Sequence, residues 1–383
     1  MQERFEEARQ ALADMESGRR RPGRTYQGFI KALMRYSLPL VDRVVGALRS
    51  AMLAMAGRYA TREGFMAFAV DGSRSEGPRT QANEKALGRG GRQKTGPQFW
   101  MTTLWHMGLG LPWAWKIGPG TDAERSHLRE LLPVLPEGAL VVADAGFVGY
   151  QLLRDIVAGG RNFLIRVGGN VTLLQGLGTA QVEDGQRVYL WPQQARRKKT
   201  PPLVLRLMVL WRHGKPIYLV TNLSEEAMSE RQAAVLYEMR WGVEVFYRSL
   251  KQTLGRRKML SEAPVQGRLE LEWTLVGLQV LGMLSVEQIL GRGKDPLSWS
   301  VAASLRMVRR TMQDRAPCRR GRAGLPRALG GAVKDAYRRR ASKAARDWPH
   351  KKNDPPAGPP IIRKATETEM KAASTLQPAK EAA

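Results

Sequence analysis

The chain has 383 residues and is strongly basic, with 62 lysine and arginine residues against 35 aspartate and glutamate residues and a net charge of +27. Hydrophobic residues make up 43% of it, which allows a sizeable core and excludes a wholly disordered protein. The single cysteine excludes a disulfide framework within the chain and a cysteine-based zinc site. The excess of positive charge predicts attraction to a polyanion, and nucleic acid fits best because basic residues are spread along the whole chain.

The first region, residues 1–62, is expected to be helical, with a basic break at 18–24 and an apolar pattern interrupted by Pro39. It shows no helix-turn-helix signature, so a small DNA-binding module and a helical brace for the core both remain open. No secretory signal is visible at the N-terminus. The apolar segment 273–286 is too short to span a bilayer, so we expect a buried helix there and no membrane association.

A second region, residues 63–295, alternates between strands and helices. Apolar runs at 64–73 and 138–147 each stop at an aspartate, Asp71 in the first and Asp144 in the second. Unbroken apolar strands predict an α/β sheet that is buried on both faces. The other elements expected in this region are a strand hairpin at 99–108 and 111–118, helices at 121–132 and 149–160, and strands at 162–167 and 215–223.

Two further interpretations concern polar residues of this region. Thr121 and Glu124 have the spacing of a capping box at the start of the helix 121–132. The four histidines, at positions 106, 127, 213 and 350, do not form a metal-ligand spacing, so each is assigned a structural role.

The composition changes at two later points. Residues 170–214 read as a small antiparallel β insertion, and a core strand then leads into a long helix. Residues 296–383 are expected to form a basic C-terminal helical region followed by a tail. From about residue 345 proline, lysine and alanine dominate without periodicity, which predicts a disordered basic tail.

The long helix carries Tyr237, Arg240, Glu244 and Lys251 within an arc of roughly 60°, and Arg248 lies close to this polar stripe. A second stripe, roughly 120° away, accounts for the packing of the helix. It consists of Val235, Met239, Val243, Phe246, Leu250 and Leu254. The polar stripe is therefore free for function. The alternative is a solvated face, in which Arg240 and Glu244 form an ordinary ion pair four residues apart.

Asp71 and Asp144 give the polar stripe a chemical context. Each aspartate taken alone fits a turn or a helix cap. Open α/β sheets, however, place their sites beyond the carboxyl ends of strands, where both could meet Glu244. Carboxylate oxygens are the ligands that Mg²⁺ prefers. Two metal ions about 4 Å apart can activate a water or a 3′-hydroxyl and stabilise the leaving oxygen of a phosphodiester. Arg240 suits a bidentate phosphate contact, and Lys251 supplies a point charge.

The pattern Tyr237-x2-Arg240-x3-Glu244-x6-Lys251 resembles the Y-R-E-K signature of bacterial insertion-sequence DDE transposases of the family-four type. The stretches "VDGS" and "VVADAGF" resemble the first and second aspartate motifs of this family, and the resemblance covers about residues 64–290. It implies a ribonuclease-H-like mixed sheet flanked by helices, with a β insertion before the glutamate helix.

The resemblance also implies roles for single residues. Asp71, Asp144 and Glu244 would be the catalytic carboxylates and would bind two Mg²⁺ ions, with Mn²⁺ as a possible substitute. Tyr237, Arg240 and Lys251 would contact DNA, and Arg248 is added because it lies close to the same stripe. The implied partners are double-stranded DNA, at the transposon ends and the target, and further copies of the chain in a dimer or larger assembly. The implied location is the bacterial cytoplasm, in association with the nucleoid.

The sequence thus predicts a DNA transposase that cuts at the ends of its element and joins them to target DNA by phosphoryl transfer. Two alternatives remain open. One is a catalytically inactive or domesticated relative that still binds DNA. The other is a ribonuclease-H-like nuclease that cuts without strand transfer.

Overall fold

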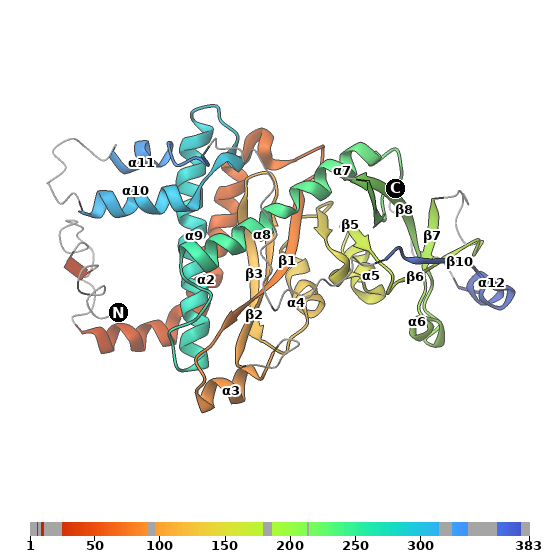
Figure 1. Ribbon diagram of the computed structural model, residues 1–383, viewed down its shortest axis with the longest axis horizontal. Coiled ribbons are helices and arrows are strands. Elements are labelled where there is room, and N and C mark those ends of the chain that lie inside the picture. The colour runs from red at the N-terminus through yellow and green to blue at the C-terminus, as the bar shows by residue number, and fades with distance from the viewer. Residues whose placement is uncertain are drawn as a thin grey trace.

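A computed structural model describes residues 6, 9–10, 25–90, 96–178, 186–212, 214–313, 324–335 and 358–376. These residues build one ten-stranded mixed sheet with the order β10-β6-β7-β8-β9-β5-β4-β1-β2-β3. Figure 1 shows this sheet running from a layer of long helices near β3 to a separate group of small elements around β6 and β10. The strands are β1 (Ala67–Glu76), β2 (Gln98–His106), β3 (Leu111–Pro119), β4 (Leu140–Ala143), β5 (Asn162–Val167), β6 (Thr172–Gln175), β7 (Arg187–Leu190), β8 (Leu203–Arg212), β9 (Lys215–Thr221) and β10 (Ile361–Lys364).

The helices complete the chain order around these strands. The α-helices are α2 (Tyr26–Ala56), α3 (Gln81–Leu87), α4 (Glu124–Leu131), α5 (Tyr150–Ala158), α6 (Gln193–Arg197), α7 (Glu230–Met239), α8 (Trp241–Arg248), α9 (Pro264–Leu290), α10 (Val301–Gln313), α11 (Gly324–Leu329) and α12 (Glu367–Ser374). Short 3₁₀ segments are η1 (Gly57–Ala60), η2 (Leu132–Val134), η3 (Ala145–Phe147) and η5 (Pro296–Ser298), and η4 (Ser249–Thr253) is a π-helical turn.

The central strands have a ribonuclease-H-like arrangement, as the sequence predicts. The chain enters at β1, forms the antiparallel strands β2 and β3 on one side, and then adds β4 and β5 parallel to β1 on the other. Phe68, Val141 and Leu164 on the three parallel strands are fully buried. The apolar runs therefore form the core, which agrees with the expected α/β sheet.

The register of β1 and β4 decides where the two aspartates lie. Their parallel pairing ends with Ala69 opposite Val142. Asp71 and Asp144 each lie two residues beyond this pair, so they occupy equivalent positions on adjacent strands, which are about 4.8 Å apart in a sheet. Strand β1 does not stop at Asp71 as expected, because its antiparallel pairing with β2 continues to Glu76.

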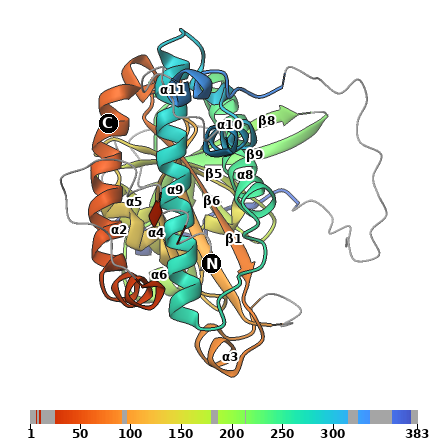
Figure 2. The same ribbon diagram turned by 90° about the vertical axis from the view of Figure 1, so that its left-hand side faces the viewer.

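The helices α2 and α9 run side by side next to β3 (Figure 2). Val41 and Val45 of α2 form a small apolar cluster with Val276 of α9. The indole of Trp273 donates a hydrogen bond to the Ser37 hydroxyl at 2.7 Å. For residues 26–56 the structure therefore fits the helical brace, and α2 continues through Pro39 without ending there.

Helix α9 contains the apolar segment that the sequence assigns to a buried helix. Among the described helices it is the one that is long and apolar enough to cross a membrane, judged by length and composition alone. In this fold Leu271, Leu275 and Leu278 are buried against the rest of the protein. This burial agrees with the expected core helix.

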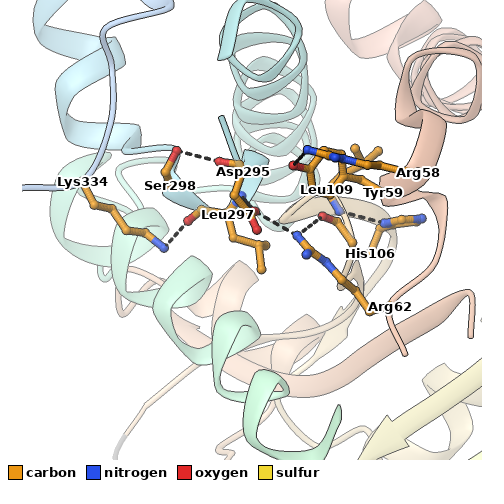
Figure 3. A network of polar contacts seen from close by, with 10 residues as sticks. Arg58, Tyr59, Arg62, His106, Leu109, Asp295, Leu297, Ser298 and Lys334 are labelled. Carbon is orange, nitrogen blue, oxygen red and sulfur yellow. Dashed lines mark hydrogen bonds and ion pairs between the residues drawn. The ribbon is translucent and has the colours of Figure 1, made fainter. Parts of the chain in front are cut away.

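Polar contacts tie the N-terminal helices to the segment after α9 (Figure 3). Arg62 donates hydrogen bonds to Asp295 Oδ1 at 2.8 Å and to the Gly108 carbonyl at 3.2 Å. Lys334 donates to the Leu297 carbonyl at 2.7 Å. Arg62 thereby links the turn after β2 to the segment after α9, and Lys334 binds that same segment.

The two described histidines are structural, as predicted. The ring of His106 packs edge-on against Phe68 and accepts a hydrogen bond from the Leu109 amide at Nδ1. Its burial, together with nearby Arg62, lowers the pKa of His106 to about 4. His127 is also buried, and its ring contacts Thr102 and Asp122. The other two histidines lie outside the described residues.

The C-terminal segment returns to the β insertion. Strand β10 pairs in parallel with β6, and α12 buries Ala373 beside Tyr189 and Trp191. Residues 358–376 are therefore folded, so the expectation of a disordered tail from about residue 345 is wrong for this part. The remainder of that predicted tail lies outside the described residues.

A buried carboxylate holds this segment in place. Glu369 of α12 accepts hydrogen bonds from Arg363 of β10 and from Arg196 of α6. The hydrogen bonds from Arg363 lower the pKa of Glu369 to about 2. Two arginines thus compensate one buried charge, which links the C-terminal segment to the insertion.

Candidate active site

Asp71 lies within β1, beneath the helix that carries the predicted signature. Its Oδ1 accepts a hydrogen bond from the Gly72 amide at 2.9 Å. Its backbone carbonyl accepts one from the buried Tyr247 hydroxyl of α8, also at 2.9 Å. Burial, followed by the nearby carboxylates of Asp144 and Glu244, raises the pKa of Asp71 to about 6. The negative charge of the Asp71 carboxylate is therefore not balanced by nearby positive charge.

Asp144 directly follows β4 and caps the short segment η3. Its Oδ1 accepts a hydrogen bond from the Gly146 amide at 2.9 Å. The residue thus has the local turn role that any strand-end aspartate could have. Its position beside Asp71, fixed by the strand register, is what distinguishes it from an ordinary turn residue.

Glu244 lies on α8, where the neighbouring Val243, Phe246 and Tyr247 are buried against the sheet. Its carboxylate accepts a hydrogen bond from Arg240 Nη2 at 2.9 Å. This is the ion pair that the solvated-face alternative predicts. Both side chains are largely shielded, however, with 12% of Arg240 and 29% of Glu244 exposed. The pair therefore lies in the site and not on an open helical face.

The packing stripe is confirmed only in part. Val243, Phe246 and Leu250 are buried, and Met239 and Leu254 pack against the core. Val235 is only half-buried, and the buried residues of α7 are instead Ala233 and Leu236.

The long helix is also not continuous. Helix α7 ends at Met239, and the amide of Val243 bonds to the carbonyl of Arg240 only three residues back. After α8, the amide of Leu254 bonds to the Ser249 carbonyl five residues back, in a π-helical turn. Such turns shift the phase of a helix and are frequent at functional sites. Lys251 lies in this turn, so the predicted straight stripe bends after α8.

The predicted DNA contacts lie on the same segment with different exposures. Tyr237 is half-buried, and the Arg240 guanidinium lies 5.6 Å from its ring centre. Arg248 is exposed. Burial, followed by nearby Arg257, lowers the pKa of Lys251, while the charge of Asp71 acts in the opposite direction. Arg240 thus lies beside Tyr237, and Lys251 is within electrostatic reach of Asp71, whereas Arg248 is on the same helix but exposed.

A fourth carboxylate, Glu124, belongs to this site and was missed in the sequence. The capping-box interpretation is wrong, because α4 begins after Ala123 and has no side-chain cap. Instead, the Glu124 carboxylate reaches Gly72 in β1 and Gly146 in the segment after β4. Burial, followed by Asp144 and Asp71, raises its pKa to about 7. The capping spacing gave a local explanation for this glutamate, and its true neighbours are distant in the chain.

The donors fit a divalent metal in chemistry, although not in a closed arrangement. Within the described residues, no three acidic, histidine or cysteine side chains are gathered as a ready ligand set. Glu244 is turned to Arg240, and Asp144 to Gly146. Asp71 is desolvated near two further carboxylates, and such a group is stabilised in its charged form by a cation. The hard oxygen donors of these residues therefore fit Mg²⁺ or Mn²⁺.

A ribonuclease-H-like sheet with one aspartate in its first strand, a second directly after the neighbouring parallel strand and a glutamate on the covering helix defines the class of DDE-type proteins. Residues 63–276 match the family described as the transposase DDE domain. This match covers more than half of the chain, so the chain belongs to the DDE transposase family.

One individual relative and one solved structure show more distant similarity. The chain is 27% identical over 277 residues to the transposase InsG for insertion sequence element IS4 of Escherichia coli (strain K12), which covers 67% of this chain and 61% of InsG. A cryo-EM structure of piggyBac transposase in a synaptic complex with hairpin DNA is 12% identical, with a TM-score of 0.40. That comparison covers 74% of this chain and 60% of the piggyBac chain. The chain thus spans about three fifths of the length of either protein.

Proposed function

We propose that this protein is an active DNA transposase that cuts at the ends of its insertion sequence and joins them to target DNA. One observation carries the proposal. Asp71 and Asp144 hold equivalent positions on adjacent parallel strands, and the Tyr247 hydroxyl ties the Glu244 helix to the backbone of Asp71. The site thus brings together carboxylates that lie far apart in the sequence.

Asp71, Asp144 and Glu244 would hold Mg²⁺ or Mn²⁺. Bound in pairs, these ions supply activation of the attacking hydroxyl and stabilisation of the leaving oxygen. Because the pKa of Asp71 is raised to about 6, metal binding below that pH must displace a proton. If Glu244 turned from Arg240 to hold the metal, the Arg240 guanidinium would become available to a DNA phosphate.

Double-stranded DNA is the proposed partner, at both the transposon ends and the target. Beside Asp144 a cleft of about 710 Å³ separates the catalytic strands from the β insertion, and Arg125, Arg196 and Arg363 are among its lining residues. Arg196 and Arg363 share one carboxylate, Glu369, so together with Arg125 they leave this cleft with excess positive charge. That charge favours a polyanionic strand that leaves the carboxylates in this direction. We further propose assembly of two or more copies on DNA, in the cytoplasm at the nucleoid.

The experiment uses the full-length protein with DNA that carries the inverted ends flanking its gene. Glu244→Gln should bind this DNA as the wild type does but lose cleavage with Mg²⁺ or Mn²⁺ at least a thousandfold. Glu238→Gln is the matched control, because Glu238 is an exposed glutamate on α7 that pairs with Arg212. This control should cleave as the wild type does.

The products separate the remaining possibilities. Strand-transfer products from the wild type support a transposase, whereas cleavage without joining would identify a nuclease. Binding without any cleavage would identify an inactive relative. Undiminished cleavage by Glu244→Gln would contradict the assignment of the site.

A further inference from the structure

Glu124 is a half-buried carboxylate that the proposed mechanism does not use. It is the first residue of α4, directly after the β3 strand region. Among the described residues its carboxylate makes no hydrogen bond or ion pair, and the positive charges of Arg74 and Arg125 lie near it without contact. A partly desolvated carboxylate without a bonded partner is unfavourable, so its position needs an explanation.

Two glycines make room for this carboxylate beside the two aspartates. A Cβ atom on Gly72, next to Asp71, would lie 2.5 Å from Glu124 Oε1. A Cβ atom on Gly146, two residues after Asp144, would lie 3.2 Å from Glu124 Oε2. The Glu124 carboxylate therefore lies between the strand that carries Asp71 and the segment that carries Asp144, and any larger residue at position 72 would displace it.

An ordinary structural role does not account for this geometry. An acidic residue in the first turn of a helix interacts favourably with the helix dipole, and Glu124 has that location. The dipole acts at the helix terminus, however, and does not require the side chain to reach two glycines on other elements. Glu130 on the same helix shows the usual arrangement, because it is exposed and pairs with Lys116.

We propose that Glu124 is a fourth carboxylate of the metal site, acting beside Asp71 and Asp144. This inference rests on the proposed metal-dependent function. Asp71, Asp144 and Glu124 are not gathered as a ready ligand set in the described residues, so a divalent ion would have to draw these three carboxylates together while Glu244 remains bonded to Arg240. Metal binding can then precede the exchange of Arg240 from Glu244 to a DNA phosphate.

The test measures Mn²⁺ binding to the full-length, DNA-free protein by the loss of the free Mn²⁺ signal in electron paramagnetic resonance. Glu124→Gln should weaken Mn²⁺ binding at least tenfold and reduce the rise in melting temperature that Mn²⁺ produces. Glu130→Gln, the control on the same helix, should leave both values unchanged. Asp71→Asn should weaken binding at least as much as Glu124→Gln does.

A second variant displaces the carboxylate without removing it. Gly72→Ala keeps all four acidic residues but forces Glu124 away from its position. It should also weaken Mn²⁺ binding, whereas Gly277→Ala should not, because a Cβ atom there meets nothing within 4 Å.

The outcomes separate this inference from the proposed function. Wild-type Mn²⁺ affinity in Glu124→Gln, together with lost affinity in Asp71→Asn, would overturn the role of Glu124 and leave the proposed function intact. Wild-type affinity in both variants would overturn the proposed metal site as well.

Discussion

Buried carboxylates occur in both the catalytic strands and the β insertion, and their environments are opposite. Glu369 in the insertion is bonded to two arginines, and its pKa is lowered to about 2. Asp71 and Glu124 in the catalytic part are desolvated beside other carboxylates, and their pKa values are raised to about 6 and 7. The first arrangement stabilises the fold, whereas the second destabilises it unless a cation binds. Uncompensated charge of this kind is a feature of functional sites.

The largest expected effect comes from the contact that holds the Glu244 helix to the sheet. A Cβ atom on Gly242 would collide with the buried ring of Trp105. Gly242→Ala should therefore destabilise the protein by about 3 kcal/mol or more, because neither the helix nor the ring has space to move. Urea denaturation measures this change. Gly277→Ala is the control in an uncrowded helix, and equal stability of the two variants would contradict the close approach.

The second prediction follows from the raised pKa of Asp71, which makes stability depend on pH. A carboxyl whose pKa is raised in the folded state stabilises the fold below its unfolded pKa of about 3.8, and this stability is lost as pH rises through 6. Asp71→Asn should thus raise the stability of the metal-free protein by about 2 kcal/mol at pH 8, and by much less at pH 4. Asp42→Asn, at an exposed position on α2, should change neither value. A loss of stability in Asp71→Asn at pH 8 would contradict the expectation that the charged Asp71 carboxylate destabilises the metal-free fold.

A smaller effect is expected from the hydroxyl beneath the site. The Tyr247 hydroxyl donates to the Asp71 carbonyl at 2.9 Å and lies 3.2 Å from the Met101 carbonyl. Tyr247→Phe should cost about 1–2 kcal/mol of stability, because buried carbonyl oxygens lose their partner. Thermal unfolding measures this, with Tyr36→Phe at an exposed position as the neutral control. Equal melting temperatures would show that this bond does not hold the helix.

The smallest effect is expected in the insertion, with the sign opposite to that of Asp71. The stability that Glu369 contributes is present above its unfolded pKa of about 4.5 and is lost as pH falls towards 2. Glu369→Gln should destabilise the docking of the C-terminal segment by about 1 kcal/mol at pH 7, since two arginines lose their acceptor. Faster proteolysis within 358–376 should report this, while Glu367→Gln, exposed on the same helix, is the control. Unchanged proteolysis would show that Glu369 does not anchor the segment.

Sequence patterns predicted the parts of the fold that depend on local periodicity. The apolar runs before Asp71 and Asp144 became β1 and β4, and the packing side of the Glu244 helix followed from helical spacing. The π-helical turn at Lys251 was not predictable in this way. One extra residue in a turn shifts the helix only slightly, so the apolar residues fit a regular helix equally well with or without it. The fold of 358–376 was missed because its strand gains stability only from pairing with β6.

By itself, the sequence determined the family, because the identities and spacings of Tyr237, Arg240, Glu244 and Lys251 depend on one segment of chain. It also determined that Asp71 and Asp144 follow apolar strands. Tertiary structure alone decided that these two aspartates share a register, and that Glu124 joins them in place of capping its own helix. The physical reason is that strand pairing, and the space left by a glycine, bring together residues that lie far apart in the chain. No local sequence pattern indicates that such residues are in contact.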